Sequence, residues 1–420
     1  MRRSSGRFFL FTSLVVVRLA GTLLYRLHTY GRVRMLALQA TRSSLFWVSV
    51  PIFFINFALP VKSKALGASA LEIGGLFSLF TLSLLLFRPL IGILLDRYGR
   101  KRFLLLALLL YSCAYAGFGF ATEVTWMYAA RFLQGLGAAL LLLSVDAITT
   151  DLAEVTERAE ALGKNFEAQA RSTFVGATIG FTLIAIVPDA GWRISFFIFM
   201  LLAVYALVVA LRFVPETAPV KSVEIDPTGL SMPMLSVLVL LVPLGFVSAM
   251  MMPIYLVYLQ DMFQPDVRWL SWAFLPAGLV FALLPSKFGA IVDRYGAVAP
   301  CAIGLALASG LYVLLPVVDG FWAVVAVYTC AAFCWAVIEP ARKAMTAQVS
   351  GSQIARGFGL AEMSFGLGAV AGPLVGGYLY DHVDHALPFF LNCGVMLVSV
   401  VILLLLVRPK LVAQGLAARL

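Results

Sequence analysis

The sequence predicts an all-α membrane protein of twelve transmembrane helices, arranged as two pseudo-symmetric six-helix bundles. Apolar residues make up 62% of its 420 residues and charged residues 12%, with a mean hydropathy of +0.97, which indicates a chain solvated by lipid. A motif also recurs: Gly-Ile-Leu-Leu-Asp-Arg-Tyr-Gly at 92–99 returns as Gly-Ala-Ile-Val-Asp-Arg-Tyr-Gly at 289–296. Duplication across half a chain is typical of membrane transporters.

Apolar stretches of about 20 residues, long enough to cross roughly 30 Å of hydrocarbon as helix, define the expected spans. The first six are expected near 43–61, 71–95, 103–122, 126–148, 165–187 and 192–213. The other six are expected near 234–259, 269–292, 298–317, 321–341, 357–379 and 387–407. The predicted parts are therefore an extension at 1–42, a six-helix bundle at 43–213, a linker at 214–232, a second bundle at 233–408 and a tail at 409–420.

The first 42 residues form a basic and apolar extension. The run from Phe8 to Leu27 is apolar, but Arg18 lies near its middle, and a central Arg costs about 2.5 to 3.5 kcal/mol on insertion scales. Three interpretations stay open: a thirteenth span, a helix at the membrane surface, or a translation start at Met35. A cleaved signal peptide is not expected, because no small-residue cleavage site follows the apolar run.

Basic residues between the spans predict the orientation, because cytoplasmic loops are rich in Lys and Arg. Most of these residues fall in connections on one side of the expected membrane: Arg97, Arg100, Lys101, Arg102, Arg158, Lys164, Lys221, Arg294, Arg342, Lys343, Arg356, Arg408 and Lys410. Both ends of the twelve-span unit are therefore expected in the cytoplasm. Short loops without an Asn-x-Ser/Thr acceptor favour a bacterial inner membrane.

Four motifs together resemble those of the major facilitator superfamily, in particular its drug and proton antiporters. The loop from Gly92 to Lys101 resembles the signature between helices 2 and 3, and Arg131-Phe-Leu-Gln-Gly-x-Gly resembles that of helix 4. Gly191-Trp-Arg resembles the start of helix 6, and Gly368-x-x-x-Gly-Pro-x-x-Gly-Gly resembles the glycine-proline motif of antiporters. The resemblance implies a secondary transporter whose two bundles rock about a central site in alternating access.

The loop motif is expected to act as a latch between the bundles. Its residues are Gly92, Asp96, Arg97, Gly99 and Arg100. Glycine allows close packing and a sharp turn, and the start of a helix favours a carboxylate. By resemblance, Asp96 would face the start of the eleventh helix. Asp151, at the end of the fourth span, is the expected partner of the loop arginines.

The second copy of the loop keeps Asp293 and Arg294, but Ala297 and Val298 stand where the first copy has two bases. The two latches are therefore expected to differ in strength. For both loops, the alternative is that positive charge serves only to set the topology.

The glycine-proline motif lies in the eleventh span, whereas in drug and proton antiporters it usually belongs to the fifth. Its residues here are Gly368, Gly372, Pro373, Gly376 and Gly377. Glycine and proline at this spacing permit close helix contact and a kink, so a packing seam is the expected role, with coupling as the alternative.

Polar and ionisable residues within the spans are candidates for the substrate cavity or for proton coupling, because an unpaired charge in lipid is costly. The candidates are Asn56, Arg131, Gln134, Asp146, Glu167, Arg171, Tyr255, Glu339 and Glu362. By resemblance, Arg131 faces the cavity or influences a coupling carboxylate, with an interhelical hydrogen bond as the alternative. Glu167 and Arg171 could simply neutralise each other. Among the carboxylates, Glu339 ranks first, followed by Asp146, Glu362 and Glu167.

The sequence predicts no enzyme, cofactor or metal site, because it contains no phosphate loop, nucleophile elbow or zinc spacing. The cluster Asp381-His382-Val-Asp384-His385 holds residues that metals bind, but an ordinary acidic loop is expected there. The net charge of +10 falls between spans and does not indicate a nucleic-acid partner.

These observations predict a monomeric secondary transporter that moves a small organic molecule across the bilayer, with export in exchange for protons as the expected mode. A facilitative or proton-symport uptake carrier is the alternative within transport. A receptor or assembly factor that keeps the fold without transporting is the alternative of another class.

Overall fold

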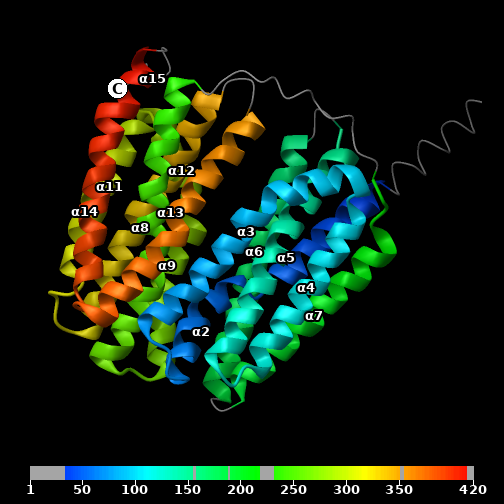
Figure 1. The fold of residues 1–420 in the computed structure, drawn as a ribbon, viewed down its shortest axis with the longest axis horizontal. Helices are drawn as coiled ribbons and strands as arrows, with labels where there is room; N and C mark the ends of the chain where they lie inside the picture. Colours follow the sequence, from blue (N-terminus) through cyan, green and yellow to red (C-terminus); the bar gives the residue numbers. More distant parts are fainter. Residues whose placement is uncertain (1–33, 155–157, 188–189, 218–230, 351–353, 414–420) are drawn as a thin grey trace, which may run out of the picture.

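The computed structural model describes residues 34–154, 158–187, 190–217, 231–350 and 354–413, and its regular elements there are all helices (Figure 1). The first helix runs from Arg34 to Ala65 and ends with α2 (Ile52–Ala65). The rest of the first half consists of α3 (Ala70–Tyr98), α4 (Lys101–Phe120), α5 (Val124–Leu152), α6 (Arg158–Ile186) and α7 (Gly191–Phe213).

The second half repeats this series. It consists of α8 (Met232–Phe263), α9 (Val267–Leu283), α10 (Pro285–Tyr295), α11 (Val298–Leu314), α12 (Phe321–Ser350), α13 (Ile354–His382), α14 (Leu387–Ile402), the π-helical turn η1 (Leu403–Val407) and α15 (Arg408–Ala413). The predicted duplication is present, because α5 begins at Val124 and α12 begins 197 residues later, at Phe321.

Nine helices within the described ranges are long and apolar enough to cross a membrane. The other predicted spans are filled by α6, by α11 and by α9 followed by α10. The first half of α6 is polar, with Glu160, Lys164, Glu167 and Arg171, and α11 has only 17 residues. The twelve predicted spans therefore each correspond to a helix or a pair of helices, as the predicted all-α fold requires.

Several predicted boundaries differ from the structure. The first helix is already present at Arg34, where the described residues begin, and not only from near residue 43, because the Met, Leu, Ala and Gln residues before residue 43 are helix formers that hydropathy alone does not count. α6 begins at Arg158, before the expected start at 165, and α12 continues to Ser350, beyond the expected end at 341. The expected span at 269–292 is divided in two after Leu284, where Pro285 has no backbone N–H and disfavours helix in the residue before it. The run from Phe8 to Leu27 lies outside the described residues.

The two halves lie side by side and are inclined, so that they meet at one end and stand apart at the other (Figure 1). We call the end where α15 and the starts of α4 and α11 lie the linker end, and the end where α2 and α8 finish the contact end. Between the halves, α3 packs against α13 and α8, α2 packs against α8, and α6 touches α9.

Candidate functional site

An ion pair joins the two halves at the contact end. Lys64, in the last turn of α2, places its Nζ 2.5 Å from Oδ1 of Asp261 on α8. The hydroxyl of Tyr380 on α13 also donates a hydrogen bond to Asp261, at 3.0 Å. Lys64 and Asp261 are 197 residues apart, the period of the duplication, so equivalent positions of the two halves carry opposite charges and meet.

A second acidic residue ties α13 to the start of α3 at the same end. The carboxylate of Asp381 accepts hydrogen bonds from the backbone N–H of Ala70 at 3.0 Å and of Leu71 at 2.7 Å. These N–H groups have no partner inside the helix, and the positive end of the helix dipole favours a carboxylate. Asp381 therefore binds the second half to the first, a specific role that the sequence analysis did not find for the predicted acidic loop.

Glycines allow α3 and α13 to approach closely beside this contact. A Cβ at Gly74 would overlap the carbonyl of Pro373, and a Cβ at Gly377 would lie 2.5 Å from the carbonyl oxygen of Ala70. The same motif packs α13 against α8, because a Cβ at Gly368, Gly372 or Gly376 would overlap Val242, Phe246 or Met250 respectively. The geometry of the glycine-proline motif is that of a packing seam with two faces.

The predicted loop motif forms a turn at the linker end that is anchored within the first half. Gly99 has a φ of +90°, which favours glycine, and the Oε1 of Glu216 accepts hydrogen bonds from the N–H of Arg100 at 2.6 Å and of Lys101 at 3.0 Å. Nε of Arg100 lies 2.7 Å from Asp151, and both side chains are over 90% buried. The expected pairing of Arg100 with Asp151 is present, while Glu216 was not anticipated.

Two features of the expected latch differ from the prediction. Gly92 was expected to allow close packing, yet a Cβ there would meet nothing within 4 Å, because α3 and α13 separate towards the linker end (Figure 1). Arg97 is exposed, and its guanidinium lies 5.4 Å from the ring centre of the adjacent Tyr98. The side chain of Asp96 lies outside the described residues, so its expected contact with the eleventh helix stays a prediction.

The second copy of the turn has the same backbone without the same anchors. Gly296 has a φ of +78°, and Arg294 lies over Tyr295 at 5.3 Å, as Arg97 does over Tyr98. Asp293 and Arg294 are both exposed. α11 starts after Ala297 with no side-chain cap, and among the described residues no carboxylate binds the backbone of this turn as Glu216 binds that of the first.

Arg131 lies in the interior of the first half. Its side chain is 2% exposed, Nη1 donates a 2.7 Å hydrogen bond to Gln134, and the guanidinium lies 4.8 Å from the ring centre of Phe77 and 5.3 Å from that of Phe80. Nε and Nη2 have no hydrogen-bond partner among the described residues. The guanidinium therefore makes one local hydrogen bond and keeps two nitrogens without a described acceptor. Because the site is shielded from water, an acceptor that reached the N–H groups of these nitrogens would bind them strongly.

The acidic candidates of the first half differ in their partners. Glu167 and Arg171 form an exposed ion pair on α6, as the neutralising alternative expected. Asp146 on α5 forms no ion pair with a described residue, although Arg88 of α3 is near enough to act on it electrostatically. Nε of Arg88 is buried and also has no described hydrogen-bond partner. Asp146 and Arg88 are thus an acid and a base on two helices that pack together, and they form no ion pair that the structure describes.

Glu339 and Glu362 belong to a closed ionic cluster in the second half. Arg342 donates two hydrogen bonds to Glu339, at 2.6 and 2.7 Å, and one to Glu362 at 3.2 Å. Lys343 lies 3.1 Å from Glu339, and the guanidinium of Arg342 lies 4.5 Å from the ring centre of Phe365. Because two cations already neutralise Glu339, the structure favours Asp146 over Glu339 as a carboxylate that could take up a proton.

The remaining cavity candidates lie on α2 and α8. Tyr255 is buried and stacks on Tyr328 of α12, with ring centres 3.7 Å apart. Tyr328 is 197 residues after Arg131, so an aromatic side chain stands where the first half has its buried cation. Asn56 is half-buried on α2. Among the described contacts, none joins Asn56, Arg131 and Glu339 in one cavity.

Several residues that join or anchor the halves were not predicted from the sequence as contacts. They are Lys64, Glu216, Asp261, Tyr380 and Asp381. The period of 197 residues could have identified Lys64 and Asp261 as a pair, because it places a base and an acid at equivalent ends of two spans. Glu216 gives no such signal, since its partners are backbone groups.

Comparisons with known proteins agree with this architecture. The Major Facilitator Superfamily model matches residues 41–235 and 237–419. Multidrug resistance protein 1 of Bacillus subtilis is 24% identical over 356 residues, covering 83% of this chain and 90% of that protein. Quinolone resistance protein NorA of Staphylococcus aureus is 22% identical over 373 residues, covering 86% and 94%.

Solved structures show the same fold. A bacterial homolog of the human lysosomal transporter Spinster superposes with a TM-score of 0.71 at 15% identity, covering 91% of this chain and 97% of that chain. The family match spans both halves and agrees with the duplicated helices and the anchored loop motif. The chain therefore belongs to the major facilitator superfamily and is a membrane transporter.

Proposed function

We propose that this transporter is a proton-coupled exporter of small lipophilic organic molecules, acting as a monomer in a bacterial inner membrane. The basic connections put the linker end in the cytoplasm. In this orientation the contact end is the outer end, and the described conformation is closed to the outside. The relatives named for multidrug and quinolone resistance support export of drug-like compounds.

The observation that carries the proposal is the contact between the halves at the outer end. Beside the glycine packing of α3 against α13, its polar contacts among the described residues are the ion pair of Lys64 with Asp261 and two backbone hydrogen bonds to Asp381, at partly exposed side chains. Contacts between partly exposed charges contribute little each, so they can break and re-form during a cycle. The anchored Gly99 turn and the ionic cluster around Arg342 each lie within one half, and so can move with it as a rigid body.

We assign proton coupling to Asp146. A coupling carboxylate must take up and release a proton during the cycle. Two neighbouring cations stabilise the ionised form of a carboxylate, so such a carboxylate takes up a proton less readily. Asp146 has Arg88 nearby but no described ion pair, whereas Glu339 is held by Arg342 and Lys343. Protonation of Asp146 would remove its attraction for Arg88, and a cationic substrate would compete with the proton for the same carboxylate.

Apolar and aromatic side chains of α8 and α12 support this substrate class. Tyr255 and Tyr328 have stacked rings, and Met250, Met251 and Met252 on α8 are adaptable apolar side chains. Tyr255, Met250 and Met251 are buried in the described conformation, so they would contact a substrate only after the helices move apart. Side chains of this kind suit flat, lipophilic molecules better than sugars, which need many hydrogen bonds.

The test is proton flux in proteoliposomes while a fluorescent lipophilic cation, ethidium, is offered under a pH gradient. The unmodified chain should move protons against ethidium, and Asp146→Asn should reduce both fluxes at least tenfold. Glu167→Gln is the matched control, because it removes a carboxylate of an exposed pair and should change neither flux by more than about twofold. Glu339→Gln should retain substrate-dependent proton flux.

Other outcomes identify the alternatives. Ethidium flux without proton movement would replace antiport with facilitated diffusion, and protons moving in the same direction as solute would indicate a symporter. Loss of proton flux in Glu339→Gln but not in Asp146→Asn would mean that Glu339, in the second half, is the coupling carboxylate. No flux of any solute under any gradient would indicate a receptor or assembly factor.

A further inference from the structure

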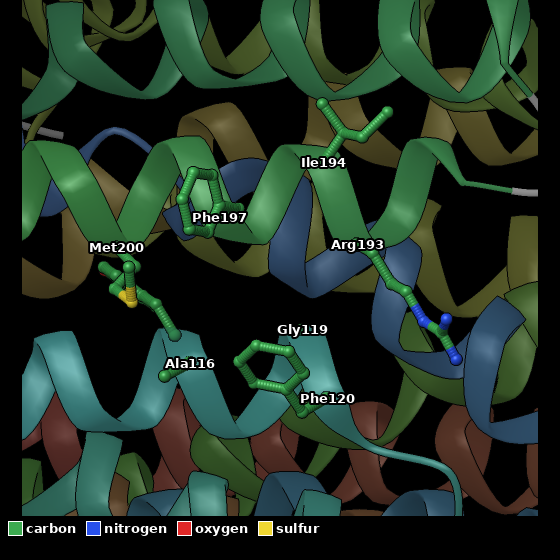
Figure 2. A pocket seen from close by; sticks show the side chains of 8 residues that line it. Ala116, Gly119, Phe120, Arg193, Ile194, Phe197 and Met200 are labelled. Carbon is green, nitrogen blue, oxygen red and sulfur yellow. The ribbon is translucent and has the colours of Figure 1, made fainter.

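A cavity of about 250 Å³ lies between α4 and α7, two helices that do not pack against the described helices of the second half. Figure 2 shows side chains of the two helices facing each other across it, with Arg193 at one end. The lining residues are Tyr115, Ala116, Gly119, Phe120, Arg193, Ile194, Phe197 and Met200. We propose that this cavity binds one acyl chain of an anionic phospholipid, whose headgroup pairs with Arg193.

The cavity exists because small residues of α4 face large ones of α7. Ala116 and Gly119 lie one turn apart, opposite Phe197 and Met200 (Figure 2). Next to these lining residues in the sequence, Trp192 donates a 2.7 Å hydrogen bond from Nε1 to the carbonyl of Phe118 and so joins the two helices. This bond holds the two helices that form the cavity in place relative to each other.

The location favours a lipid over a transported substrate. Within the described chain, α4 packs against α5 and α7, and neither α4 nor α7 packs against a helix of the second half. Phe120 is 74% exposed and Phe197 53% exposed at the rim, which in a membrane protein means contact with acyl chains. Drug-sized ligands occupy about 300 to 1,000 Å³, so the cavity suits a narrow chain better.

The charge distribution favours an anionic headgroup. Arg193 lies in the first turn of α7, it is exposed, and it forms no ion pair with a described residue. Met200 lies two turns further along, about 10 Å into the bilayer, so the charge sits at headgroup level and the apolar walls below it. The positive end of the helix dipole at the start of α7, which has no side-chain cap, adds to the attraction for a phosphate.

The test is native mass spectrometry of the full chain released from bilayer discs that hold equal amounts of phosphatidylglycerol and phosphatidylcholine with identical acyl chains. We expect one phosphatidylglycerol to be retained about fivefold more than phosphatidylcholine, as one headgroup-level cation allows. Arg193→Gln should abolish this preference. Arg212→Gln is the matched control, because it removes an exposed Arg from the other end of the same helix and should leave the preference unchanged.

A second pair of variants tests the cavity itself. Ala116→Leu should fill it and reduce retention of both lipids at least threefold, while Gly310→Leu, on an exposed face of α11 with open space around it, should not. If Ala116→Leu does not fold, Met200→Trp fills the cavity from the other wall. Equal retention in the filled variants would mean annular lipid only and overturn the proposal, as would a preference that survives Arg193→Gln. Displacement of the lipid by ethidium would instead assign the cavity to a substrate.

Discussion

The two Asp-Arg-Tyr-Gly turns share a backbone but differ in what holds them. Both glycines have positive φ, at Gly99 and Gly296, and both arginines lie over the tyrosine that follows. Only the first turn is described with side-chain anchors: Glu216 binds its backbone and Asp151 binds Arg100. The difference shows that the chain path depends on local geometry that both turns share, while the electrostatic anchors are described in the first half alone.

The largest expected effect is loss of the buried anchor. Asp151→Asn keeps the shape but removes the charge opposite Arg100, and an uncompensated buried charge should cost about 3 kcal/mol of unfolding free energy. Asp293→Asn, at the exposed carboxylate of the second turn, should cost less than about 0.5 kcal/mol. Unfolding in mixed micelles measures both. Equal losses would mean that the second turn has an anchor of similar strength.

A second difference between the halves is the pair of opposite charges at equivalent positions, Lys64 and Asp261. Lys64→Asp should place two carboxylates together, prevent closure of the contact end and reduce transport at least tenfold, or about 1.4 kcal/mol. The exchanged double variant, Lys64→Asp with Asp261→Lys, should recover most of the rate. Lys62→Asp, two residues away on the same helix, is the control. A double variant as slow as the single one would show that the pair is not a gate.

How far the sequence predicts this molecule depends on the kind of information each feature needs. The twelve spans and the duplication follow from local hydropathy and a repeated motif, which any window of the chain displays. Pro285 could also have predicted the break between α9 and α10 at Leu284. The mean hydropathy of a window of about 20 residues does not show this break, because the flanking residues are apolar. The pairing of Lys64 with Asp261 could have been found from the period of 197 residues. The contact of Asp381 with the start of α3 could not, because it depends on the packing of α13 against α3 and its partners are backbone groups.

A third comparison separates the strain of the turn from its anchor. Gly99→Ala should cost about 2 kcal/mol, because the positive φ is strained and the new Cβ would lie 2.6 Å from the Glu216 carboxylate that caps α4. Gly296→Ala should cost about 1 kcal/mol, from the φ alone. In a Glu216→Ala background the two costs should converge, since the cap is already lost. If Gly99→Ala and Gly296→Ala still differ by about 1 kcal/mol of unfolding free energy in the Glu216→Ala background, the contact with Glu216 does not explain why the first turn is more sensitive.

The smallest expected effect concerns the feature that the two turns share. Arg97→Gln and Arg294→Gln each remove an exposed guanidinium that lies over its neighbouring tyrosine. Each should lower the free energy of unfolding by less than about 0.5 kcal/mol, and the two losses should be similar. Transport should distinguish two explanations of Arg97. If this side chain contributes only to local stacking and to topology, both variants should transport alike. If Arg97→Gln alone slows transport, Arg97 must form a contact between the halves in the conformation closed at the linker end, which is the latch that the family resemblance implies.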